Sequence, residues 1–138
     1  MKTLVMLAGI GHLLLAAGSL TIPGTLGWRS ETAKLNLLTR QVFWTYAGYI
    51  WVAHICFGLV STLTPHLLLD GSPLAAMVCG FIALWWLARL IIHFVWFDRS
   101  ARPPGTIYQL AEAALVAFFA GCAGVYAVAA WIDIRGGG

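Results

Sequence analysis

Charged residues are scarce in this chain. Of its 138 residues only 8 are Lys or Arg and 5 are Asp or Glu, whereas 61% of the sequence is hydrophobic. About a quarter of the residues in a soluble domain are charged, and a domain of this size has too little interior to hide so much apolar surface. The composition therefore excludes an ordinary water-soluble fold and indicates that lipid covers part of the chain.

The sequence also lacks the motifs of several common functions. Its three cysteines, Cys56, Cys79 and Cys122, fall inside apolar runs and show no CxxC spacing, which argues against a disulfide framework and a structural zinc site. There is no GxSxG, no HExxH and no phosphate-binding glycine loop. The basic residues form no patch, so we expect no nucleic-acid partner. The histidines do not cluster at the short spacings of a di-metal site, so we expect no metal site.

Four apolar segments are long enough to cross a membrane. A helix needs about 20 apolar residues to span the roughly 30 Å hydrocarbon core, and residues 3–22, 42–63, 74–97 and 108–132 meet that requirement. Ser72 and Pro73 are typical of a helix start and mark the third segment. The sequence predicts an all-α fold: an integral membrane four-helix bundle with short loops, in which residues 1–138 form one transmembrane domain.

The first span has features of a cleavable signal peptide, because Lys2 precedes an apolar stretch that ends in small residues. The apolar part of a signal peptide has about 7–15 residues, and the present one is longer and contains His12. We therefore favour its retention as a helix. Residues 30–39 alternate leucines with polar residues, and we expect them to lie along the membrane surface and to meet the second span at a bend.

Basic residues in the loops predict the orientation. Cytoplasmic loops carry an excess of Lys and Arg. The predicted topology places five basic residues on one side of the membrane and two on the other. We expect an inner membrane of bacterial type, with the first and third loops cytoplasmic and both termini outside. The five are Arg29, Lys34, Arg40, Arg99 and Arg102, and the two are Lys2 and Arg135.

Ionisable residues inside the spans are the strongest functional signal, since burying them in lipid is costly. Arg89 and His93 are four residues apart and share a helix face, and Glu112 lies at a similar depth in the fourth span. We predict an Arg89–Glu112 ion pair within a polar cluster that also includes His93, Tyr108 and Tyr46. Alternatively, the pair only tethers two helices.

His12 and His54 fall near the middle of their spans, with small residues one turn away. A neutral imidazole is a good axial ligand for haem iron, and the small neighbours leave room for a flat macrocycle. The two histidines therefore form a candidate binding site for a haem, another pigment or a quinone. Alternatively, each imidazole forms a hydrogen bond between helices. Trp51, Trp85 and Trp86 also lie deep and are expected to pack against helices or a ligand.

Small residues recur every four positions in the fourth span, at Ala113, Ala117 and Gly121. Such a face lets two helices approach closely, in this chain or between copies. The favoured hypothesis is a non-enzymatic subunit or assembly module of a membrane complex. The alternatives are a proton-coupled or anion transporter that works as an oligomer, and a membrane-embedded acid–base enzyme; whether the protein is an enzyme stays open, with the balance against it.

Overall fold

The computed structural model describes residues 1–97 and 105–136, all of which lie in helices or short connections. The helices are α1 (Lys2–Ser19), α2 (Ile22–Thr25), α3 (Trp28–Ala33), α4 (Leu37–Leu63), α5 (Pro73–Val95) and α6 (Thr106–Gly136). Four segments are long and apolar enough to cross a membrane: Lys2–Thr25, α4, α5 and α6. The predicted all-α fold with four membrane-length helices is confirmed. Two of the basic residues used to predict the orientation, Arg99 and Arg102, lie outside the described residues.

Side-chain caps explain where two of the long helices begin. The Ser72 hydroxyl accepts a hydrogen bond of 3.1 Å from the N–H of Ala75, and Pro73 is the first residue of α5, as the sequence predicts. Asn36 caps α4 in the same way, with its Oδ1 accepting from the N–H of Thr39 at 2.8 Å. Because of this cap, α4 begins at Leu37 rather than at residue 42.

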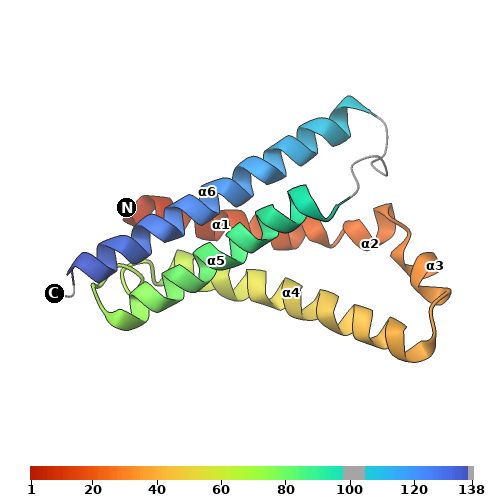
Figure 1. The fold of residues 1–138 in the computed structure, drawn as a ribbon, viewed down its shortest axis with the longest axis horizontal. Helices are drawn as coiled ribbons and strands as arrows, with labels where there is room; N and C mark the ends of the chain where they lie inside the picture. Colours follow the sequence, from red (N-terminus) through yellow and green to blue (C-terminus); the bar gives the residue numbers. More distant parts are fainter. Residues whose placement is uncertain (98–104, 137–138) are drawn as a thin grey trace.

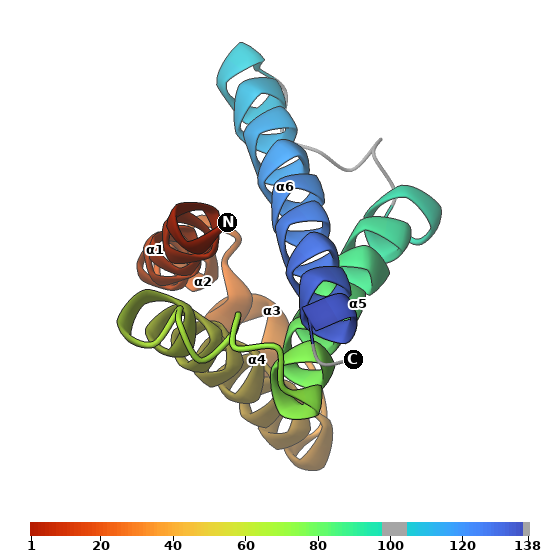
Figure 2. The ribbon, with the colours of Figure 1, turned by 90° about the vertical axis from the view of Figure 1, so that its left-hand side faces the viewer.

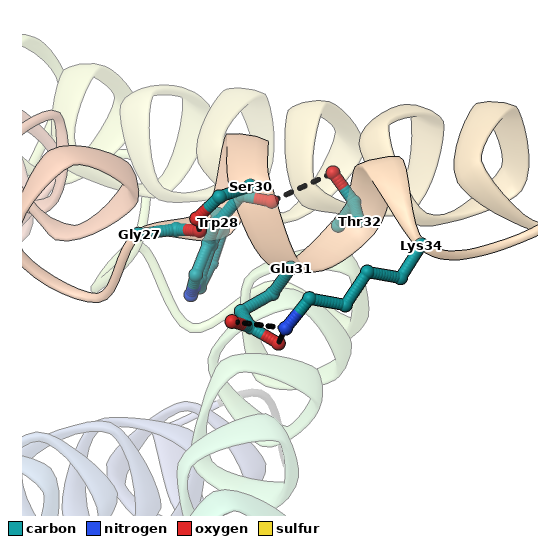
Figure 3. Close-up of polar contacts among 6 residues, drawn as sticks. All are labelled: Gly27, Trp28, Ser30, Glu31, Thr32 and Lys34. Carbon is teal, nitrogen blue, oxygen red and sulfur yellow. Dashed lines mark hydrogen bonds and ion pairs between the residues drawn. The ribbon is translucent and has the colours of Figure 1, made fainter.

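The chain bends sharply between the first two long helices (Figure 1). Gly27 precedes α3 with a φ of 60°, a left-handed conformation that glycine adopts without strain. At the other end of α3, Lys34 turns back to Glu31, and its Nζ lies 2.8 Å from Oε2 of that carboxylate (Figure 3). The break before α4 is the bend that the sequence predicts. That this segment lies on the membrane surface stays a prediction.

The long helices pack as two pairs. α1 packs against α4, α5 packs against α6, and α1 also contacts α6. Figures 1 and 2 show the helices closest together at the end that carries both termini and the α4–α5 loop, and spread apart at the opposite end. The buried core therefore lies toward the closed end, where α5 and α6 contribute most of it: Cys79, Ile82, Trp86, Phe119, Cys122, Tyr126, Ala129 and Ala130.

The contact between α1 and α4 depends on two glycines. A Cβ atom added to Gly9 would lie 2.8 Å from Cβ of Ser61 and 2.9 Å from the backbone nitrogen of Thr62. A Cβ added to Gly58 would lie 2.6 Å from Cδ2 of Leu13. Both approaches are closer than real side chains allow, so the two backbones meet only because these positions lack a side chain.

We expect the Gly9→Ala substitution to lower the free energy of unfolding by about 1–3 kcal/mol, the usual cost of overpacking. The matched control is Gly80→Ala in α5, where an added Cβ meets nothing within 4 Å; there the better helix propensity of alanine should leave stability unchanged or raise it by up to about 1 kcal/mol. Unfolding in mixed detergent micelles measures both. Equal effects of the two substitutions would contradict the close α1–α4 contact.

Candidate functional site

His12 is fully buried in the core, and both of its ring nitrogens have partners. Nδ1 lies 2.7 Å from the carbonyl oxygen of Ala8, one turn earlier in α1. The indole Nε1 of Trp86 donates a hydrogen bond of 2.8 Å to Nε2. Since an indole nitrogen can only donate and a carbonyl can only accept, the imidazole is the neutral form with its proton on Nδ1. His12 thus connects α1 to α5.

His54 lies beside this pair on α4. Its ring stacks on Trp86 at a centroid distance of 5.2 Å and lies 6.1 Å from the ring of His12. Its Nδ1 is buried and has no hydrogen-bond partner among the described residues. The structure therefore brings the two candidate histidines together, but the nitrogen of His12 that could bind iron already accepts from Trp86. A two-histidine clamp would require Trp86 to release it.

Two further hydrogen bonds connect the long helices near this cluster. The hydroxyl groups of Ser61 on α4 and Tyr126 on α6 are 2.6 Å apart, and both side chains are fully buried. The indole of Trp51 on α4 donates to the carbonyl oxygen of Ala16 on α1 at 2.9 Å. All of these groups are neutral, so the hydrogen bonds of this cluster connect the helices without burying a net charge.

The second polar cluster joins α5 to α6. Nε2 of His93 lies 3.2 Å from Oε1 of Glu112, and both side chains are largely buried. The guanidinium of Arg89 lies over the rings of Phe97 and Phe119, 5.1 Å and 5.3 Å from their centroids. The predicted Arg89–Glu112 pair is not among the ion pairs of the described residues; the carboxylate contacts the histidine one turn further along α5.

Tyr46 and Tyr108, which the sequence also assigns to this cluster, are both exposed. Tyr46 belongs to α4, which packs against α1, and 63% of its side chain is exposed. Tyr108 is in the first turn of α6 and is also exposed. The structure brings His93 and Glu112 into contact, and Arg89 lies one turn before His93 on α5. Tyr46 does not join them, because α4 has diverged from α5 at this end of the bundle (Figure 1).

The small-residue face of α6, formed by Ala113, Ala117 and Gly121, is exposed. A Cβ added to Gly121 or to the neighbouring Gly124 would meet nothing within 4 Å. The opposite side of the helix is the buried one. The face that the sequence marks for helix packing therefore packs against no other helix in the described part of the chain.

Sequence reasoning missed the role of Trp86 in the first site and the burial of Asp133 near the end of α6. It expected Trp86 to pack against helices or a ligand but did not identify it as the partner of His12. It did not consider Asp133, which lies one residue beyond the predicted fourth span and is 2% exposed. The available signal was an acidic residue at the end of an apolar segment, where a carboxylate is usually taken to face water.

Comparison of the chain with known protein families, with characterised proteins and with solved structures finds no match. Fold and sites together define its class: a helical protein with four membrane-length helices, a neutral hydrogen-bonded core and a cluster of ionisable groups between α5 and α6.

We expect the Trp86→Phe substitution to destabilise the protein by about 1–3 kcal/mol, because it leaves the buried Nε2 of His12 without a donor. Trp85→Phe is the matched control, since it removes the same atoms from a partly exposed position whose indole makes no hydrogen bond with the described residues. Thermal unfolding followed by circular dichroism compares them. Similar losses for both variants would show that the indole–imidazole bond contributes little.

Proposed function

We propose that this protein is a non-enzymatic helical module of a membrane, a subunit or assembly factor that binds further membrane helices through α6. The observation that carries the proposal is the outward position of the small-residue face, Ala113, Ala117 and Gly121. The buried side of α6 packs within the chain, so this face is available to another helix.

Packing forces in lipid support this proposal. Apolar side chains gain little by leaving lipid for another helix, so association depends on close van der Waals contact and hydrogen bonds. Within the chain, Gly9 and Gly58 already provide such a contact between α1 and α4. The α6 face has the same chemistry and is exposed, which is the arrangement expected of a surface that another membrane helix covers.

The proposal includes an orientation. Arg29 in α3 and Arg40 at the start of α4 belong to the end of the molecule opposite both termini (Figure 1). The excess of basic residues on cytoplasmic loops then favours cytoplasmic α1–α4 and α5–α6 connections, with both termini outside, in an inner membrane of bacterial type.

The alternative function is a proton-coupled or anion transporter, which would use the cluster of Arg89, His93 and Glu112. The 3.2 Å contact between His93 and Glu112 favours it, since such a pair can exchange a proton. Four helices are few for a transport path, so this function requires self-association. The identity of the α6 partner therefore separates the two proposals.

We expect Gly121→Leu to weaken association at least about tenfold, because the larger side chain keeps the partner helix at a distance. Gly48→Leu adds the same side chain to an exposed glycine of α4 with open surroundings and should leave association unchanged. Native mass spectrometry from nanodiscs measures the complexes. A different chain as the partner supports the subunit, and a homo-oligomer supports the transporter. A monomer, or equal effects of the two variants, contradicts the use of this face.

Cofactor binding is a third candidate function. The observation that favours it is the buried Nδ1 of His54, which has no partner among the described residues. Aromatic rings surround this imidazole, as they would a flat ligand. Visible spectra of the protein expressed with ample haem, oxidised and reduced, test this candidate. We expect a Soret band that the His54→Ala substitution abolishes. A featureless spectrum would exclude haem and leave both histidines as packing residues.

A further inference from the structure

A cavity of about 380 Å³ lies between the start of α5 and the end of α6, next to the α4–α5 loop. Its volume falls in the range of small-ligand sites, about 300–1,000 Å³. One acidic residue lines it, and its other walls are apolar or glycine: the lining residues are Gly71, Pro73, Ala76, Met77, Asp133 and Ile134. The cavity is thus an apolar hollow with a single carboxylate.

Asp133 is only partly satisfied at this site. Its Oδ1 accepts a hydrogen bond of 3.0 Å from the N–H of Gly71, which fastens the loop to α6. Its Oδ2 is buried and has no hydrogen-bond partner among the described residues. A buried carboxylate oxygen without a donor is costly, so the site favours a ligand that supplies both a positive charge and a donor.

The basic residue nearest to Asp133 in the sequence does not supply that charge. Arg135 follows two residues later, but its guanidinium lies over the ring of Trp131, 4.4 Å from the centroid. Asp70, at the edge of the same loop, adds a second negative charge. Hydrogen bonds from the side chain and backbone of Ser72 hold the pKa of Asp70 below its usual value, so this carboxylate stays ionised at neutral pH. The residues that line the cavity therefore carry one carboxylate and no basic side chain, and the ionised Asp70 lies in the adjoining loop.

We propose that this cavity binds a small primary ammonium ligand, with the ammonium group at Asp133 and the alkyl part against Pro73, Met77 and Ile134. An ammonium group brings three N–H donors to the carboxylate, and the apolar walls suit a short alkyl chain. A bound metal ion is a poorer fit, because no group of three or more His, Cys, Asp or Glu side chains occurs among the described residues and metals need several such ligands. The inference is independent of the function proposed for α6.

Isothermal titration of the full-length protein in detergent, at constant ionic strength, tests the proposal with three probes. We expect n-butylammonium to bind, n-butanol to fail because it lacks the charge, and tetramethylammonium to bind more weakly because it has no N–H donor. The Asp133→Asn substitution keeps an oxygen for the N–H of Gly71 and should weaken butylammonium binding at least about tenfold. Asp70→Asn removes the same charge from outside the cavity and should have a much smaller effect.

Failure of butylammonium to bind, or equal binding to wild type and Asp133→Asn, would overturn the proposal. If Asp133→Asn does not fold, the Ala76→Leu substitution decides the question, because it fills the cavity and leaves the carboxylate intact. Binding must then be lost, and unchanged binding to this variant would overturn the site. None of these results depends on whether α6 binds another helix.

Discussion

Helices that are surrounded by lipid need some interaction other than hydrophobic burial to remain together. In this protein the hydrogen bond from Trp86 to His12 is central, since it joins α1 of one helix pair to α5 of the other. The bond between Ser61 and Tyr126 connects the same two pairs through α4 and α6. Around these contacts the aromatic rings pack edge to face or stacked. The closed end of the bundle is thus a hydrogen-bonded core filled by rings.

Charged side chains lie at the border of this core. Arg89 lies six residues before the last residue of α5, roughly 9 Å along the helix axis. A long side chain can cover that distance toward the membrane surface. Its guanidinium rests on Phe97 and Phe119, and cation–π contacts offset part of the loss of hydration. The structure therefore divides its polar groups by depth, with neutral donors and acceptors in the middle and ionisable groups toward the ends.

The sequence predicted the number and approximate limits of the four long helices because each is an uninterrupted apolar run, and it predicted the Ser72 cap because of the proline that follows. It could not predict the rotation of each helix about its axis. Arg89 and His93 lie on one face and compete for Glu112, and their spacing alone does not decide which of them contacts the carboxylate.

Periodicity likewise marks a small-residue face on α6 but does not reveal whether a helix of this chain covers it. Asp133 escaped notice because its burial depends on the loop around Gly71, which comes from a distant part of the sequence.

The length of α6 has a consequence for the bilayer. Its 31 residues extend over roughly 46 Å. The predicted apolar segment within it, residues 108–132, extends over roughly 37 Å, which is more than the roughly 30 Å of a typical hydrocarbon core. Hydrophobic mismatch of this kind is relieved by tilt or by local thickening of the lipid. Because α6 diverges from α4 toward its first turn (Figure 2), a thinner bilayer should increase that tilt and widen the spread end, whereas a thicker one should bring the helices upright. Membrane thickness should therefore change the angle at which α6 meets a partner helix.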